Sequence, residues 1–215
     1  GEMRKMIVQV SRNGHVYALD RMNGDFLYAG EYTRVNWAER DERGKPVLKE
    51  SLYEPADTMV FPGLYGGKNW PPASYSPDTH MLYIPTTEWG TRFIRREGDA
   101  RAGTMDLGGI PQFDTTGTGW VVAFDMLSGE IAWQKEMPGN FNWAGTLSTG
   151  GGLVFSGAPD GHVYAMNDET GEVLWKFQTG SGIYAPPTSF TIDGKQYIGV
   201  ASGTRNPVTR AGVAT

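Results

Sequence analysis

The sequence predicts an all-β fold, a partial β-propeller of about three and a half four-stranded blades. Two observations support this prediction: a hairpin-like phrase recurs along the chain, and short apolar runs alternate with Gly-rich turns. The 215 residues include 30 Gly and 13 Pro. This composition is typical of a turn-rich globular protein.

The recurring phrase reads "NGHVYALDRMNGDFLY" at 13–28, "TGWVVAFDMLSGEIAW" at 118–133 and "DGHVYAMNDETGEVLW" at 160–175. In each copy an Ala is followed at the same offsets by Asp or Asn, by Gly and by an aromatic residue. Ala123 and Ala165 lie 42 residues apart, which suits one propeller blade. Asx and Gly predict a tight hairpin turn, and the aromatic residue returns on the next strand. We expect Trp133 and Trp175 to bury against the Ala face of a neighbouring blade.

The elements follow one another along a single domain, 1–215. Three strands are expected at the front ("KMIVQV", "HVYALD", "DFLYAGEY"), four in each of two central blades, and two at the back in "APPTSFTIDGKQYIGVAS". The expected blade portions are about 4–33, 70–137, 141–178 and 184–202, with inserts at about 37–60 and 91–116. Sheet edges would be exposed at both ends. The fold therefore needs the rest of a longer chain, or another copy, as a partner.

Charge and cysteine content exclude several classes of site. The net charge of -5 offers no broad basic surface for nucleic acid. The absence of Cys excludes a disulfide or a thiolate metal site within these residues. His15, His80 and His162 lie far apart without metal-ligand spacing. No apolar run is long enough for a membrane helix, and no signal peptide is visible. Since a strand-like run follows Gly1 so closely, we expect the chain to be a piece of a longer one.

Four segments resemble the C-terminal part of the quinoprotein alcohol dehydrogenases: "SRNGHVYALDRMNG", "PGLYGGKNWPPASYSP", "NWAGTLSTGGGLVFSGAPDG" and "TGEVLWKFQTGSGIYAPP". The resemblance covers nearly the whole chain apart from the two inserts. Blade repeats alone are weak evidence, whereas "GGKNWPP" combined with "RNG" is much more specific. The resemblance implies an eight-bladed propeller that binds pyrroloquinoline quinone (PQQ) and calcium.

The resemblance also implies roles for individual residues. Arg12, of "RNG", would reach the quinone oxygens as the catalytic cation and stabilise the anionic reduced cofactor. Asn69 of "NW" would hydrogen-bond the cofactor with Trp70 beside it, and Trp143 of "WAG" would line the same axial site. Each residue alone has a structural explanation, as a solvated turn Arg, a turn residue or a core Trp. Their joint occurrence favours the functional one.

The implied function is oxidation of an alcohol by hydride transfer to PQQ, with electrons passing to a cytochrome or quinone acceptor in the periplasm. The family's calcium ligands, catalytic Asp, vicinal Cys pair and one stacking Trp belong to its N-terminal part, so we expect no metal ligands here and no activity from the isolated chain. The alternative is a non-catalytic propeller of the outer-membrane assembly lipoprotein type. An upstream Cys-Cys pair and a "WDYD"-like segment would favour the enzyme.

Two further segments bear on partners and cofactor. "RFIRREGDARAG" (92–103) carries four Arg and is either a cytochrome-docking loop or a solvated insert, of which the solvated insert is favoured. The end of the chain, "SGTRNPVTRAGVAT" (202–215), departs from the family pattern. We therefore expect no dependable backbone contact from it to the quinone.

Overall fold

The computed structural model describes residues 4–50, 58–95, 102–103, 109–114 and 116–203, and the regular structure in these ranges is entirely β-strand. The first sheet has the order β1-β2-β3, with β1 (Met6–Val10), β2 (His15–Asp20) and β3 (Phe26–Glu31). All its pairings are antiparallel. The predicted all-β class is therefore confirmed.

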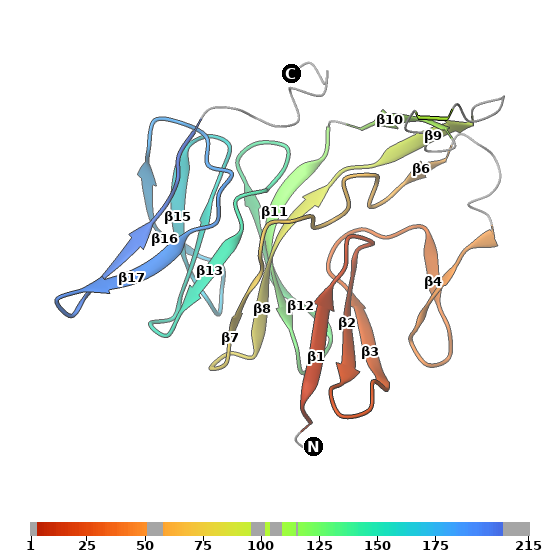
Figure 1. Ribbon diagram of the computed structural model, residues 1–215, viewed down its shortest axis with the longest axis horizontal. Coiled ribbons are helices and arrows are strands. Elements are labelled where there is room, and N and C mark those ends of the chain that lie inside the picture. The colour runs from red at the N-terminus through yellow and green to blue at the C-terminus, as the bar shows by residue number, and fades with distance from the viewer. Residues whose placement is uncertain (1–3, 51–57, 96–101, 104–108, 115, 204–215) are drawn as a thin grey trace.

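Two complete four-stranded blades follow. The first has the order β12-β11-β8-β7, from β7 (Ser74–Ser76), β8 (Met81–Glu88), β11 (Thr118–Asp125) and β12 (Glu130–Met137). The second has the order β13-β14-β15-β16, from β13 (Thr146–Thr149), β14 (Leu153–Gly157), β15 (His162–Asn167) and β16 (Val173–Gln178). A final hairpin pairs β17 (Thr188–Ile192) with β18 (Lys195–Gly199). Figure 1 shows these sheets following one another as the blades of an open, partial propeller.

Segments between the first sheet and the next blade, and an insert within that blade, carry small sheets that the sequence did not predict. β4 (Ala38–Arg40) pairs with β5 (Pro46–Leu48). The order β10-β9-β6 joins β6 (Met59–Val60), β9 (Thr91–Arg95) and β10 (Gly109–Phe113) into a sheet at the upper right of Figure 1. A segment that precedes the first four-stranded blade thus pairs with the insert between that blade's β8 and β11.

The repeated phrase folds the same way in all three copies. Its turn glycines have positive φ, +78° at Gly24, +76° at Gly129 and +72° at Gly171, which only glycine adopts without strain. A bulge follows the Ala in each hairpin, and that Ala pairs with the aromatic residue of its own hairpin. The pairs are Ala18–Tyr28, Ala123–Trp133 and Ala165–Trp175. The repeat in the sequence therefore corresponds to a hairpin that recurs in the structure.

The aromatic residue of one hairpin docks on the next blade, but not on its Ala face. Tyr28 donates from its hydroxyl to the Met126 carbonyl at 2.9 Å, and Trp133 donates from Nε1 to the Asp168 carbonyl at 3.0 Å. A Cβ added at Gly171 would lie 2.6 Å from the Trp133 ring, so the ring covers the turn glycine of the following blade. The expectation that the aromatic residue packs on the Ala face of a neighbouring blade is wrong, because each Ala lies opposite the aromatic residue of its own hairpin.

Trp175 has no such partner among the described residues. After β16, the described residues form only the β17–β18 hairpin, and the Trp175 ring covers no turn glycine there. Trp175 is 52% exposed, and the expectation that it is buried is wrong for this part of the chain.

Neighbouring blades share apolar layers on both faces of β11. Val121 and Ala123 pack toward the following blade, in a cluster with Val154, Tyr164 and Met166. Val122 and Phe124 pack toward the first sheet, in a cluster with Val16, Tyr32 and Ile84. Successive side chains of a strand point to opposite faces, so a strand covered on both faces reads as a continuous apolar run, here "WVVAF".

Within the residues that the structure describes, no helix is both long enough and apolar enough to span a bilayer.

Candidate functional site

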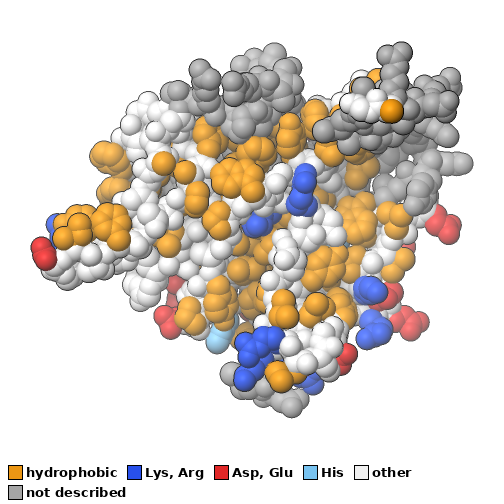
Figure 2. Space-filling view, in the orientation of Figure 1, with side chains coloured by type: hydrophobic (Ala, Val, Ile, Leu, Met, Phe, Trp, Pro, Cys, Tyr) orange, Lys and Arg blue, Asp and Glu red, His pale blue; other side chains and the backbone are white. Residues whose placement is uncertain are grey.

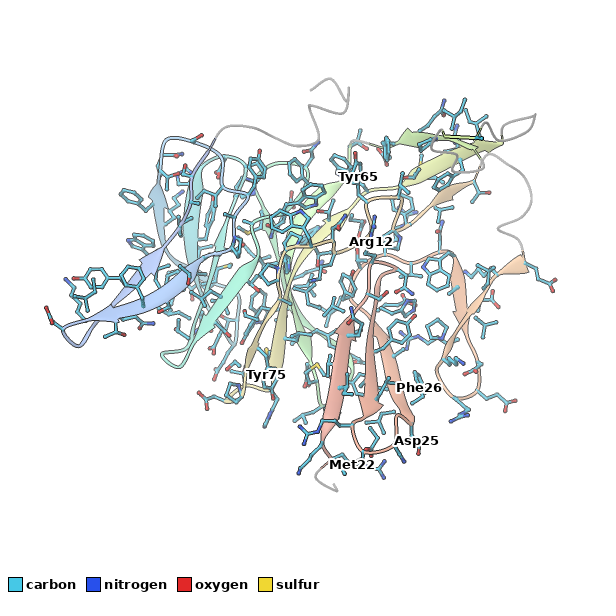
Figure 3. All side chains as sticks on the ribbon, viewed as in Figure 1. Arg12, Met22, Asp25, Phe26, Tyr65 and Tyr75 are labelled. Atoms are coloured by element: carbon cyan, nitrogen blue, oxygen red, sulfur yellow. The ribbon has the colours of Figure 1, made fainter. Side chains whose placement is uncertain are left out.

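The predicted site residues lie in three connections between strands. Arg12 lies in the turn between β1 and β2, Asn69 and Trp70 lie between β6 and β7, and Trp143 lies between β12 and β13. Figure 3 shows Arg12 and Tyr65 at one end of the sheets, with Met22 and Asp25 at the other. The predicted residues can form one site only if loops of successive sheets meet at one end.

A chain of backbone hydrogen bonds ties these connections together. The Gly67 amide donates to the Arg12 carbonyl at 3.0 Å, and the Thr87 amide donates to the Gly67 carbonyl at 2.7 Å. The Asn142 amide then donates to Thr87 Oγ1 at 3.1 Å. Asn142 is 1% exposed and directly precedes Trp143. The loops of Arg12, Asn69 and Trp143 are thus linked by main-chain hydrogen bonds and by the buried Thr87 hydroxyl.

The three predicted residues meet at the dipeptide Leu64–Tyr65. Arg12 donates from Nη2 to the Leu64 carbonyl, and Asn69 donates from Nδ2 to the Tyr65 carbonyl at 3.3 Å. The Trp143 ring lies edge-on to the Tyr65 ring, with centroids 5.8 Å apart. Trp70 lies at the rim, 56% exposed, with its centroid 6.5 Å from that of Trp143.

An aromatic cluster that sequence reasoning missed surrounds Tyr65. Tyr65 lies 4.9 Å from Phe113 and 5.7 Å from Trp89, centroid to centroid. Phe141 contacts Trp89 and Trp143 edge-on and stacks on Tyr184 at 5.8 Å and 12°. The available signal was an aromatic residue beside each Gly-rich or Asn-rich loop, in "GLYGG", "FNWAG" and "GIYAPP". The site therefore has an apolar wall contributed by several blades.

Two cations stand at this wall without an acidic partner. Lys68, also missed, is half-buried and donates from Nζ to the Asn69 carbonyl at 3.1 Å, and burial lowers the pKa of its ammonium group. Across the described ranges, no carboxylate lies within ion-pair distance of Arg12 or Lys68. Blue Lys and Arg side chains are visible in the middle of this face in Figure 2. Backbone carbonyls hold both cationic groups, so both charges are available to an anion.

Glycine is required where the two cation-bearing turns cross. A Cβ at Gly66, which has φ of +76°, would lie 2.8 Å from the Arg12 carbonyl oxygen. A Cβ at Gly67 would lie 2.6 Å from Cγ2 of Thr33 and 2.9 Å from the Tyr32 hydroxyl oxygen. The "GG" of "GGKNW" therefore allows the close approach of the Gly66–Gly67 segment to the turn that carries Arg12.

Comparison with known proteins links this geometry to a family. The family model described as glucose/ethanol/alcohol dehydrogenase, beta-propeller domain, matches residues 119–198. A quinoprotein ethanol dehydrogenase of Pseudomonas aeruginosa is 36% identical over 94% of this chain and 35% of its own length. The quinohemoprotein alcohol dehydrogenase ADH IIB of Pseudomonas putida is 34% identical over 99% of this chain and 32% of its own length. The chain is similar to the quinoprotein alcohol dehydrogenases over about a third of their length.

Solved structures agree with this relationship. The quinohemoprotein alcohol dehydrogenase of Comamonas testosteroni superposes with a TM-score of 0.77 at 32% identity, over 93% of this chain and 32% of that one. A europium-containing methanol dehydrogenase superposes with a TM-score of 0.82 at 32% identity, over 95% and 37%. The predicted resemblance to the C-terminal part of the quinoprotein alcohol dehydrogenases is confirmed, and so is the partial propeller. The chain spans about a third of the length of these relatives.

Several predictions about this quinoprotein relative fall outside the described residues. Half of the Arg-rich segment 92–103 (96–101) and residues 204–215 lie there, so the docking and C-terminal expectations stay predictions. Within the described ranges, His, Cys, Asp and Glu residues form no group of three or more that could hold a metal ion.

Proposed function

We propose that this chain forms part of a PQQ-dependent alcohol dehydrogenase, which oxidises an alcohol by hydride transfer to PQQ and passes the electrons to a cytochrome or quinone acceptor. The observation that carries the proposal is the pair of cations, Arg12 and Lys68, without carboxylate partners beside the Asn69 amide and an aromatic wall. Similarity to quinoprotein alcohol dehydrogenases supports it.

The residues present fit PQQ, a planar, tricarboxylic ortho-quinone. Its carboxylates require cations and amide donors, and its ring requires apolar or aromatic neighbours. When bound, it supplies the hydride acceptor. Arg12 would hold a positive charge at the quinone oxygens, where negative charge develops. Asn69 would orient the cofactor through its amide, and Trp143 would exclude water from one side of the site.

The remaining parts of the site are expected outside this chain. We expect calcium to be held by ligands outside these residues, and we expect the catalytic base there as well. The protein would act in the periplasm.

The proposed structural partner is the remainder of the propeller or another copy of the chain. At one end, Trp175 is uncovered, and Phe190, Ile192 and Tyr197 of the last hairpin are 47%, 53% and 38% exposed. Figure 2 shows hydrophobic side chains gathered over that hairpin. Beside the edge strand β1, a hollow of about 390 Å³ lies between Met6 and Val8 of the first sheet and Tyr75 and Leu82 of the next blade. The exposed hairpin supports a further blade at its end of the chain, and the unpaired edge of β1 supports a further strand for the first sheet.

The proposal is tested on two proteins, the full-length protein that contains this chain and the 215-residue chain itself. PQQ binding is measured by tryptophan fluorescence and alcohol oxidation by a dye-linked assay with calcium added. We expect the full-length protein to do both, the isolated chain to do neither, and full-length Arg12→Ala to lose about 100-fold or more in kcat, as for removal of one charge-stabilising donor. Arg12→Lys is the matched control and retains part of the activity. Unimpaired Arg12→Ala, or robust turnover by the isolated chain, contradicts the proposal.

A further inference from the structure

Tyr32 contacts both ends of the turn that carries Arg12. It follows β3 directly and is fully buried, with 0% exposure. Its backbone amide donates to the Gly14 carbonyl at 3.0 Å, and its hydroxyl donates to the Ser11 carbonyl at 2.7 Å. One residue thus fixes the first and last peptide groups of the turn 11–14.

The same hydroxyl lies against the second cation-bearing segment. A Cβ on Gly67 would lie 2.9 Å from the Tyr32 oxygen. Burial raises the pKa of Tyr32, while the backbone amide of Lys68 and the charge of Arg12 act in the opposite direction. The phenol oxygen is therefore close to Lys68 and to Arg12 at once, between the two segments that carry the candidate ligands of the cofactor.

We propose that Tyr32 is a positioning residue, whose hydroxyl holds the Arg12 turn in register with the Gly67–Asn69 segment so that Arg12 and Asn69 can bind the same anionic ligand. The inference rests on the proposed function, because it names how this chain's part of that site is held. Tyr32 does not itself touch the ligand, since its ring is enclosed in the core with Val16, Ile84 and Phe124.

The hydroxyl and the ring have separable roles. The ring packs in the apolar layer between the first two sheets, and a Phe ring would fill the same space. Loss of the hydroxyl leaves the partly buried Ser11 carbonyl with the longer bond from the Gly14 amide, at 3.3 Å, so the turn can shift. A shift of about 1 Å is enough to weaken a bidentate or charge-assisted contact strongly. The effect should therefore reach the ligand more than the fold.

The test compares Tyr32→Phe with Tyr28→Phe in the full-length protein. Tyr28 is a matched control, because it lies in β3 and also loses one hydrogen bond from its hydroxyl to a backbone carbonyl, that of Met126. We expect both variants to show similar small decreases in Tm. Only Tyr32→Phe should raise the Kd for PQQ, by about tenfold, with a lower kcat at saturating PQQ. Equal Kd values for the two variants overturn the inference.

Two further variants keep the result interpretable. Arg12→Ala is measured in parallel: if it binds PQQ like the wild type, the proposed function of this site is wrong, whereas weak binding by Arg12→Ala with normal binding by Tyr32→Phe refutes only the role of Tyr32. Gly67→Ala keeps the phenol and places a methyl group against its oxygen, so it should weaken PQQ binding in the same way. Normal PQQ affinity in folded Gly67→Ala also counts against the proposal, including when Tyr32→Phe does not fold.

Discussion

Replacement of Trp133 by Ala should destabilise the chain far more than the same change at Trp175. Trp133 covers Gly171 of the next blade and donates to the Asp168 carbonyl at 3.0 Å, whereas Trp175 is 52% exposed. Truncation of a buried Trp costs about 3 to 5 kcal/mol. Trp133 is only partly buried, so we expect about 3 kcal/mol for Trp133→Ala and less than about 1 kcal/mol for Trp175→Ala.

Urea denaturation of the 215-residue chain, followed by circular dichroism, measures both values. Trp133→Phe separates ring packing from the hydrogen bond, since it retains an aromatic ring and removes the donor, and should cost about 1 kcal/mol. Equal losses for Trp133→Ala and Trp175→Ala would refute the docking of each aromatic on the following turn glycine. In the full-length protein the loss at Trp175 should rise toward that at Trp133, because the proposed partner blade covers it.

The remaining predictions concern a buried histidine and the turn glycines. Burial is the main cause that lowers the pKa of His15 to about 4, and the charge of Arg40 lowers it further. A hydrogen bond to the backbone of Asn13 acts in the opposite direction. The unfolded chain therefore binds a proton that the folded chain does not, so stability is full above about pH 6.5 and falls as the pH drops toward 4, by up to about 3 kcal/mol. His15→Gln should flatten this slope in urea titrations, and an unchanged slope in His15→Gln contradicts the assignment. Gly171→Ala should cost about 3 kcal/mol, from positive φ and a Cβ 2.6 Å from Trp133, while Gly24→Ala, with open space, should cost only about 1 kcal/mol. Similar thermal midpoints for these two variants would show that Gly171 is not a docking surface.

The blade strands could be predicted because each depends on local patterns. Alternating apolar residues, Asx-Gly turns and a fixed period are enough to place β2 and β3, or β15 and β16. The small strands β4, β6 and β9 could not be predicted in this way. β6 has two residues, and its pairing with β9 joins segments about thirty residues apart along the chain, where local sequence carries no register information. The expected burial of Trp175 was wrong, because the β17–β18 hairpin that follows leaves the ring 52% exposed.

The sequence was enough to place Arg12, Asn69 and Trp143 in loops. It could not identify the residues that contact them and hold them in position. Tyr65 and Lys68 lie in the same quoted segment as Asn69, yet nothing in a single sequence separates a ligand-facing ring or ammonium group from an exposed one. Tyr32 could not be identified at all. Its role depends on two carbonyl groups, of Ser11 and Gly14, which sequence does not distinguish from any others.

The turn that carries Arg12 shows how a repeated scaffold could hold the cation proposed to bind the cofactor without a loss of stability. The equivalent turn in the later blade has Pro159 at this position, and both turns keep the same frame: the amides of His15 and His162 bond to the side chains of Asn13 and Asp160 at 3.2 Å and 3.0 Å. Gly14 and Gly161 both have positive φ, +96° and +87°. The frame depends on the Asx residue and the Gly, and the exposed residue before them is not part of it. Arg12→Ala should therefore change the unfolding free energy by only about 0.5 kcal/mol while PQQ binding is lost. A large drop in Tm for Arg12→Ala would show instead that the arginine is a structural residue, and its loss of activity would then have a different cause.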